Sequence, residues 1–387
     1  MFGDPFQTYT GVTMRILSSS LLAYALLVTG MLVDGVAARA NELPMATNNI
    51  ESLTPEQARR LVKTSSGTEI EMERKGFGKV QVPECLPLNG LKSLNRDTAT
   101  ALAGYGKGPL LLSGLTTLDA ATAEALAGVQ SKKLFLSGLP TLHVESAKAL
   151  ADFKGDVLFL DGLTALDVDT AKALAGFKCM ALSFGGLNTL TPETARLLAD
   201  FNGQYLYLDG VRTLNADTAE AIAKFRGGFL GLNGLTTLDA DTAETLAEFK
   251  GWGMVLNGLP TLDVATAKAL ARFKGQMLQL QGLTALAANA AEALAAVEMW
   301  DGQLPAFATL DSVATAQALA THKGPLALPN LKKVSLKALM ALKKNDDVKM
   351  PNTTSLELIP EPDGGETEEG VIPERLETRK HPAIRAK

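Results

Sequence analysis

The sequence is poor in the residues that build metal sites, disulfide frameworks and histidine-based active sites. It contains two cysteines and three histidines in 387 residues, with no HExxH or CxxC spacing. Two cysteines cannot form a disulfide framework, and three scattered histidines leave little material for a metal centre. Aromatic residues are only 5%, and 37 basic residues face 42 acidic ones. A net charge of −5 gives nucleic acid no strong electrostatic reason to bind. We therefore expect no enzyme, no catalytic residue, no metal and no cofactor.

The N-terminal residues resemble a secretory signal. An apolar run from Leu21 to Val33 follows Arg15 and precedes Ala38-Arg39-Ala40, the order of a signal with its cleavage site. We expect residues 1–40 to be removed, and Met14 is a more natural start for such a signal than Met1, which suggests a misassigned start. The predicted location is secreted or in the cell envelope. An uncleaved anchor helix over residues 16–33 is the alternative, which Ser18 to Ser20 weaken.

The rest of the chain is dominated by a repeat of 24 residues. Glycine recurs at 90, 114, 138, 162, 186, 210, 234, 258 and 282, and Ala306 and Asn330 hold the same phase. Positions of the repeat are counted here from this glycine as zero. Leucine fills position 4 from Leu94 to Leu310, and position 12 is leucine or isoleucine from Leu102 to Leu294. Eleven copies with such invariant apolar positions predict one shared core.

Each copy changes its apolar period from two to about 3.6, which predicts a strand followed by a helix. The strand contains the leucines at positions 20 and 22, and the helix covers positions 6 to 16. The N-caps are predicted at Asp119, Asp167, Asp239, Asp263 and Asp311. Bases in the last turn complement the helix dipole, at Lys154, Lys178, Arg226, Lys250 and Lys274. The glycines that follow are expected to end the helices in a left-handed conformation, at Gly155, Gly203, Gly227, Gly251 and Gly275.

A 24-residue unit cannot bury its own leucines, so neighbouring units must stack. The predicted fold is an α/β solenoid with eleven parallel strands on one face and helices on the other. The GLTxL and TAxALA segments resemble the leucine-rich repeat family, particularly bacterial exported members, over residues 86–342. The family's usual asparagine, three residues after the second leucine, is replaced here by leucine, as at Leu115 and Leu139. Other groups must therefore satisfy the backbone of the turns.

We divide the chain into the signal (1–40), an N-terminal cap (41–85), eleven repeats (86–344) and a disordered charged tail (345–387). In the cap, residues 53–59 echo a repeat helix, and residues 69–72 and 79–82 alternate like strands that would cover the end of the core. The tail is acidic over 357–369 and basic over 370–387. The C-terminal unit carries several lysines, which suit a unit open to water.

The cysteines and histidines all have structural explanations. Cys85 and Cys179 precede the first and fifth strands, about 19 Å apart by strand spacing, too far for a disulfide. We expect two separate thiols. His143 occupies an N-cap position and His322 a last-turn base position.

The candidate binding site is the sheet face turned away from the core, at positions 19, 21 and 23. Side chains alternate along a strand, so the residues between the buried leucines should form a concave exposed face. That face is unusually apolar, which commonly marks a binding site. Its predicted partner-binding residues are Leu111, Phe135, Val157, Phe159, Tyr205, Tyr207, Phe229, Val255 and Met277. A polar row runs beside it, at Asp161, Asp209, Asn233, Asn257 and Gln281. Trp252 and Trp300 share position 18 and would extend its rim.

The favoured function is non-enzymatic binding of a protein or peptide through this face. A glycan is the second candidate ligand, and a homodimer through the same face would have the same pattern. The alternative function is a structural spacer of the cell envelope, attached by its tail. A glycoside hydrolase needs two carboxylates about 5 to 9.5 Å apart, and Asp161 and Asp209 are expected about 10 Å apart, so this hypothesis is remote.

Overall fold

The computed structural model describes residues 46–65, 69–74, 78–83 and 85–360. The predicted signal, residues 1–40, lies outside them. No helix among the described residues is long and apolar enough to cross a membrane. The α-helices of the described part are α3 (Pro55–Thr64), α4 (Arg96–Leu102), α5 (Ala120–Ala127), α6 (Val144–Leu150), α7 (Val168–Ala175), α8 (Pro192–Ala199), α9 (Ala216–Ala223), α10 (Ala240–Leu246), α11 (Val264–Leu270), α12 (Ala288–Ala295), α13 (Val313–Ala320) and α14 (Leu336–Leu342).

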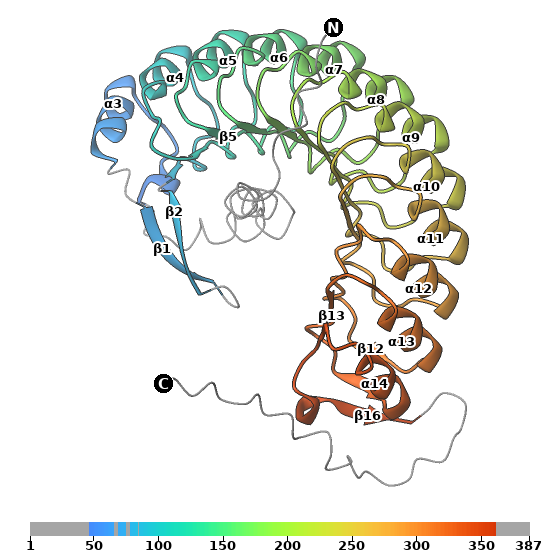
Figure 1. The fold of residues 1–387 in the computed structure, drawn as a ribbon. Coiled ribbons are helices and arrows are strands. Elements are labelled where there is room, and N and C mark those ends of the chain that lie inside the picture. The colour runs from blue at the N-terminus through green and yellow to red at the C-terminus, as the bar shows by residue number, and fades with distance from the viewer. Residues whose placement is uncertain (1–45, 66–68, 75–77, 84, 361–387) are drawn as a thin grey trace, which may run out of the picture.

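Nine short strands form one parallel sheet in strict chain order. They are β3 (Leu86–Pro87), β4 (Leu110–Leu111), β5 (Lys133–Phe135), β6 (Val157–Phe159), β7 (Ala181–Ser183), β8 (Tyr205–Tyr207), β9 (Phe229–Gly231), β10 (Gly253–Val255) and β11 (Met277–Gln279). Each residue pairs with the residue 24 positions later, as in Leu134 with Leu158. Figure 1 shows an arc with the sheet inside and the helices outside. The predicted α/β solenoid is confirmed.

The 24-residue glycine is required because adjacent repeats approach closely at the turn after each strand. A Cβ atom built on Gly258 would lie 2.1 Å from the carbonyl oxygen of Asn233 in the previous repeat, and one on Gly138 would lie 2.0 Å from that of Ser113. No side chain fits at such distances, so the backbone itself fixes the repeat period.

The glycines after the helices have a different role from the predicted one. The only positive φ angle among the described residues is that of Gly302, so the left-handed conformation predicted for Gly155 and its equivalents is wrong. A Cβ on Gly155 would instead lie 2.2 Å from Cζ of Phe153, and Gly251 has the same relation to Phe249. These glycines make room for a column of buried phenylalanines at position 15. Neighbouring rings of this column are nearly parallel, with centroids 6.2 Å apart for Phe225 and Phe249.

At most helix starts, the side chain of the N-cap residue accepts a backbone hydrogen bond. Asp119, Asp167, Asp239 and Asp263 accept the backbone N–H three residues later, as predicted. The prediction for Asp311 is wrong, because the helix starts one residue later and Ser312 is its cap. His143 occupies the N-cap position of α6 but makes no capping hydrogen bond.

In many of the repeats, a buried hydroxyl at position 8 links the helix to the preceding repeat. Thr122 Oγ1 donates to the carbonyl oxygen of Leu94 at 3.3 Å, and Ser146 Oγ donates to that of Leu118 at 2.7 Å. Together with the leucine core, these bonds hold the first turn of one helix against the segment that precedes the helix of the previous repeat.

The repeat breaks after β11, so the predicted single sheet of eleven strands is corrected to nine. Trp300 pairs with Leu278 in an isolated bridge, a spacing of 22 residues instead of 24. Its indole is 2% exposed and takes the core place that leucine has elsewhere, and Gly302 follows with φ of 63°. Beyond this point the strands are β12 (Thr309–Leu310), β13 (Leu326–Ala327), β14 (Lys333–Ser335), β15 (Val348–Lys349) and β16 (Glu357–Ile359).

At the N-terminal end, α3 packs against α4 and closes the core with the buried Ala58. The short 3-10 helix η1 (Ala46–Asn49) precedes it. The predicted strands form an antiparallel hairpin, β1 (Glu69–Arg74) with β2 (Gly78–Pro83). In Figure 1 this hairpin projects from the first repeats on the inner side of the arc, away from the helices. α3 therefore covers this end of the core, and the covering expected from the two strands stays a prediction.

At the C-terminal end, ordered structure continues past residue 345. β15 pairs with β13, and β16 pairs with β14, after the 3-10 helix η2 (Thr353–Ser355). The prediction of a disordered tail is corrected for residues 345–360. The rest of the predicted tail, 361–387, lies outside the described residues.

Candidate binding surface

The two faces of the parallel sheet carry two separate apolar clusters. The leucines at positions 20 and 22 belong to the main core beneath the helices. The alternate side chains form a second cluster, here called the inner-face cluster, of Val157, Phe159, Ala181, Tyr207, Phe229 and Val255, with Phe135, Tyr205 and Met277 packed against it. Eight of the nine predicted binding residues are thus brought together. Leu111 lies on the same ladder, paired with Phe135, and Ala181 is an addition.

Most of this cluster is less accessible than the sequence suggested. Val157 and Tyr207 are 0% exposed and Phe159 is 3% exposed. Rings lie across glycines of the next strand: a Cβ on Gly231 would be 2.7 Å from Cδ1 of Tyr207, and one on Gly253 would be 2.8 Å from Cδ2 of Phe229. The members that keep accessible surface are Phe135, Tyr205 and Met277.

The rings of the cluster are in contact with one another. The Phe135 and Phe159 rings stack with centroids 4.0 Å apart, and Phe229 has both Tyr205 and Tyr207 at 5.8 Å. Trp252 extends this group, at 6.3 Å from Phe229. Aromatic contacts of this kind add rigidity to the area that they cover.

Three exposed apolar side chains, on separate repeats, lie where the strands begin, which we call the strand-start edge. Met180 is 39% exposed, Trp252 40% and Met299 41%. The carbonyl oxygen of Met180 accepts the backbone N–H groups of Gln204 and Tyr205, and that of Trp252 accepts those of Gln276 and Met277. The edge is therefore continuous with the accessible end of the inner-face cluster. Sequence analysis found only Trp252 here, because isolated methionines carry no pattern.

The two tryptophans predicted to share the rim have different positions. Trp252 is exposed, and its Nε1 donates to Oε1 of Gln276 at 2.9 Å. Trp300 is buried at the repeat break and contributes nothing to the rim.

The polar row at position 23 replaces the asparagines that the family pattern lacks. Asp161 Oδ1 accepts the backbone N–H of Gly185 at 2.7 Å, and Asp209 Oδ1 accepts that of Asn233 at 3.0 Å. Asn233 and Asn257 accept in the same way from the residue 24 positions later. These four side chains thus accept a backbone hydrogen bond from the turn of the next repeat. The sequence analysis predicted that some groups would do so in place of the missing asparagines, without naming them.

Two carboxyl groups on this side have raised pKa values. Burial raises the pKa of Asp209 to about 6, and the charge of Asp161 acts in the same direction. Burial also raises the pKa of Asp301 to about 6, although Gln281 donates a hydrogen bond to it. Asp161 Oδ1 accepts hydrogen bonds from the backbone N–H of Gly185 and from the hydroxyl of Ser183, the latter at 2.6 Å. The geometry gives Asp161 and Asp209 structural hydrogen bonds rather than a paired acid and base.

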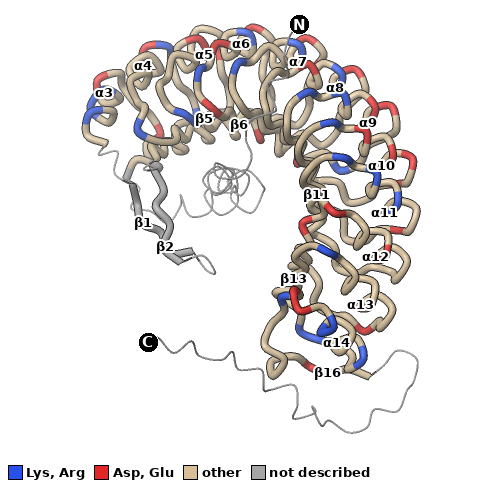
Figure 2. Tube along the Cα trace, in the orientation of Figure 1, with Lys and Arg blue, Asp and Glu red and all other residues tan. Residues whose placement is uncertain are grey.

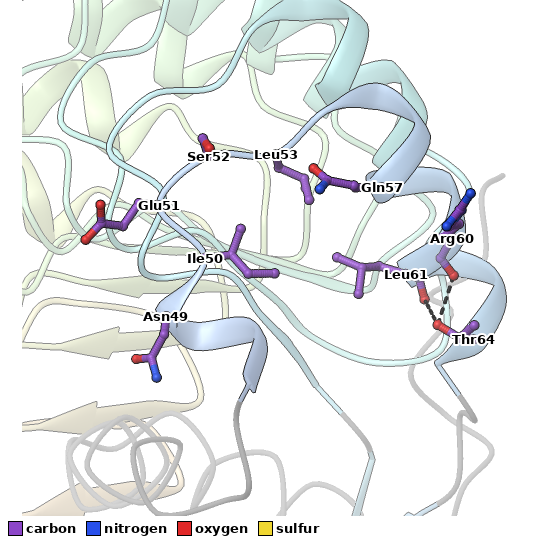
Figure 3. A pocket seen from close by; sticks show the side chains of 9 residues that line it. All are labelled: Asn49, Ile50, Glu51, Ser52, Leu53, Gln57, Arg60, Leu61 and Thr64. Atoms are coloured by element: carbon purple, nitrogen blue, oxygen red, sulfur yellow. Dashed lines mark hydrogen bonds between the residues drawn. The ribbon is translucent and has the colours of Figure 1, made fainter.

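A pocket of the described part lies at the N-terminal cap, between η1 and α3. It has a volume of about 600 Å³, with Ile50, Leu53 and Leu61 among its lining residues. Figure 3 shows Thr64 at its border, where the hydroxyl donates to the carbonyl oxygens of Arg60 and Leu61. Arg60 itself pairs with Glu56. The residues of the pocket precede the 24-residue repeats, so the repeat pattern did not indicate it.

The described residues contain no group of three metal-binding side chains. Cys85 and Cys179 are not joined in a disulfide, as predicted. Cys179 is buried, and burial raises its pKa to about 12. His322 is also buried, and it occupies the place of phenylalanine in the position-15 column rather than a last-turn base position.

Comparisons with known proteins find similar solved structures only. No protein-family model and no curated protein matches the sequence. Leucine-rich repeat proteins are among the solved structures that resemble it. An internalin from Listeria monocytogenes is 13% identical, with a TM-score of 0.43, over 81% of this chain and 95% of that chain. Toll of Drosophila, in complex with Spatzle, is 14% identical with a TM-score of 0.41, over 67% of this chain and 39% of that chain. Internalin C2 from Listeria monocytogenes is 15% identical with a TM-score of 0.32, over 59% and 91%.

Proposed function

We propose that this chain is a non-enzymatic binding protein that holds a protein or peptide partner on the inner side of its arc. The observation that carries the proposal is the inner-face cluster, an apolar surface separate from the core, on the sheet face opposite the helices. Its accessible residues lie beside the strand-start edge, where Trp252 approaches Phe229 with ring centroids 6.3 Å apart, and exposed apolar surface is typical of binding sites.

The accessible residues determine which substitutions test the proposal. Phe159 and Tyr207 are buried, so aspartate at either position would destabilise the fold as well as any complex. Tyr205 and Met277 are better targets because part of each side chain is accessible. The matched control replaces Val168 and Met340, which are 38% and 53% exposed elsewhere on the molecule.

The experiment is capture of partners from the protein's own extracellular medium or envelope fraction. The parent, the Tyr205→Asp, Met277→Asp variant and the Val168→Asp, Met340→Asp control are compared, each with its melting temperature. We expect a defined protein to be retained by the parent and the control and lost by the inner-face variant at unchanged melting temperature. Equal retention by all three would contradict the proposal.

A structural spacer is the second candidate, and the continuity of the core favours it. The main core extends without interruption from Ala58 to Leu342, as a rigid rod would require. Deletion of residues 361–387 would then release the protein from the envelope, while the inner-face substitutions would change nothing.

We also propose that the chain is exported, as its N-terminal pattern and the resemblance to exported repeat proteins suggest. N-terminal sequencing of protein recovered from the medium should begin near Asn41. Recovery of the intact N-terminus in the membrane fraction would favour the uncleaved anchor.

A further inference from the structure

Four successive repeats carry no charged side chain at positions 18 to 22, where the chain enters and forms the strand. The uncharged stretches contain β8, β9, β10 and β11, and they are residues 204–208, 228–232, 252–256 and 276–280. The repeats of β5 and β6 differ, with Lys132, Lys133 and Asp156 at the same positions. Figure 2 shows charged residues recurring along the helices, on the outer side of the arc. A ligand on this part of the inner face therefore meets an uncharged surface.

Trp252 is the most exposed apolar side chain of these stretches. Its indole is 40% exposed, and Nε1 donates to Oε1 of Gln276 in the next repeat at 2.9 Å. The same position of the previous repeat is Gly228, which places no side chain beside the indole. Because its single donor is satisfied, the indole offers a ligand its apolar ring.

Carboxamide groups with unused hydrogen-bonding capacity lie beside the indole. Gln276 uses Oε1 for Trp252, and its Nε2 donates to no atom of the described residues. Gln279, in β11, has a buried Oε1 without a hydrogen-bond partner in the described structure, and its Nε2 has a weak contact with Sδ of Met277 at 3.6 Å. The Gln279 side chain as a whole is partly exposed, so rotation of its carboxamide brings the unpaired oxygen to a ligand. An unpaired polar atom is costly until a partner satisfies it.

These groups restrict the class of ligand. Phe229 and Val255 beneath the surface are 1% and 0% exposed, so the accessible atoms at β10 and β11 belong to the indole, the Met277 thioether and the carboxamides. A sugar ring has an apolar C–H face that stacks on an aromatic ring, and hydroxyl groups that both donate and accept. Carboxamides also donate and accept, and they carry no charge. A protein partner would instead place apolar anchors in pockets.

We propose that the inner face at β10 and β11 binds an uncharged oligosaccharide. One sugar ring stacks on the indole of Trp252 and accepts a hydrogen bond from Nε2 of Gln276. Gln279 lies three residues further along the strand, about 10 Å away, so the next ring lies over Met277 and donates to Oε1 of Gln279. The site adds a second class of ligand to the proposed function and does not depend on a protein partner.

The test uses the fluorescence of Trp252. The chain contains two tryptophans and Trp300 is buried, so quenching by acrylamide reports on Trp252. Chitohexaose, cellohexaose and maltohexaose are titrated into the full chain. We expect at least one of them to protect Trp252 from the quencher, with a Kd below about 1 mM.

Two variants and a control locate the site. Gln279→Leu should weaken binding about tenfold at an unchanged or higher melting temperature, because it removes the unpaired oxygen. Trp252→Ala, followed by calorimetry because the reporter is lost, should abolish binding. Gln317→Leu changes an exposed glutamine of α13 and should bind as the parent does.

An anionic polysaccharide is the competitor, because Arg226, Lys250 and Lys274 precede three of the uncharged stretches by two residues. Tighter binding of polygalacturonate than of the three oligosaccharides would overturn the inference. Equal binding by the parent and Gln279→Leu, or no protection of Trp252 at about 10 mM oligosaccharide, would also overturn it. Capture of a protein that is lost in the Tyr205→Asp, Met277→Asp variant, without any saccharide binding by the parent, would preserve the proposed function and reject the saccharide site.

Discussion

The imidazole of His322 lies against the indole of Trp300, with ring centroids 4.9 Å apart, at the place where the repeat breaks. Nδ1 of His322 is 3.0 Å from the carbonyl oxygen of Ala295. Nε2 of His322 and Nε1 of Trp300 are both buried without a hydrogen-bond partner in the described structure. Two polar atoms are thus buried where the other repeats have leucine and phenylalanine.

Replacing His322 by phenylalanine should stabilise the protein. The change restores the position-15 column and removes a buried unpaired nitrogen, a gain of about 1 kcal/mol in the free energy of unfolding after loss of the bond to Ala295. Phe273→His, the reverse change in a regular repeat, should cost about 2 kcal/mol. Urea denaturation measures both. A loss of stability in His322→Phe would show that the bond to Ala295 outweighs the unpaired nitrogen.

The same break shows what sequence reasoning could and could not predict. The strand and helix of each repeat followed from leucine spacing, and four of the five aspartate caps followed from their position. Trp300 kept the phase in sequence, but its indole entered the core and shortened the spacing to 22 residues. Whether such a side chain enters the core depends on the volume available there, and the apolar pattern of the sequence does not give that volume.

The sequence predicted which residues form the candidate surface but not how far they are exposed. Alternation along a strand correctly separated Phe159 and Tyr207 from the leucine core. The ring of Tyr207 lies over Gly231 of the neighbouring strand, and the ring of Phe229 lies over Gly253. Such cross-strand contacts require the three-dimensional register.

Gly258→Ala should be strongly destabilising, because the new methyl carbon would lie 2.1 Å from a backbone oxygen of the previous repeat. Backbone cannot yield as a flexible side chain does, so we expect a loss of about 3 kcal/mol or more. Gly228→Ala is the control, since its nearest atom is 3.4 Å away, at the end of the Gln204 side chain. Thermal unfolding of the pair should show a large decrease for the first only. Similar melting temperatures would mean that the turns can separate at little cost.

His143→Asp should stabilise α6 by supplying a missing cap. His143 makes no capping hydrogen bond, whereas Asp167 accepts the backbone N–H of Thr170 at 2.8 Å in the next repeat. An N-cap of this type contributes about 1 kcal/mol, so Asp167→Ala should lose about what His143→Asp gains. The hydrogen bonds from Thr170 also lower the pKa of Asp167. This stabilisation is present above pH about 4 and disappears as the pH falls through the lowered value. A gain that is unchanged at low pH would exclude a charged cap.

Asp209→Asn should stabilise the protein at neutral pH, with an advantage that disappears in acid. The pKa of Asp209 is raised by burial from 3.8 to about 6, so the folded state retains a proton that the unfolded state has lost. Stability from this group is therefore complete below pH about 4, falls as the pH rises to about 6 and stays low above that. Asparagine keeps the acceptor for the Asn233 backbone, as Asn233 itself does for Asn257.

The full pKa shift corresponds to about 3 kcal/mol, and solvent at the half-buried carboxyl reduces the expected gain to about 1 kcal/mol at pH 7. Chemical denaturation at pH 7 and pH 4.5 measures the difference between variant and parent. Asp263→Asn is the control of opposite sign, because the backbone N–H of Thr266 lowers the pKa of that carboxyl. An advantage of Asp209→Asn that does not change between the two pH values would show that the carboxyl is well solvated, and that its charge costs the fold nothing.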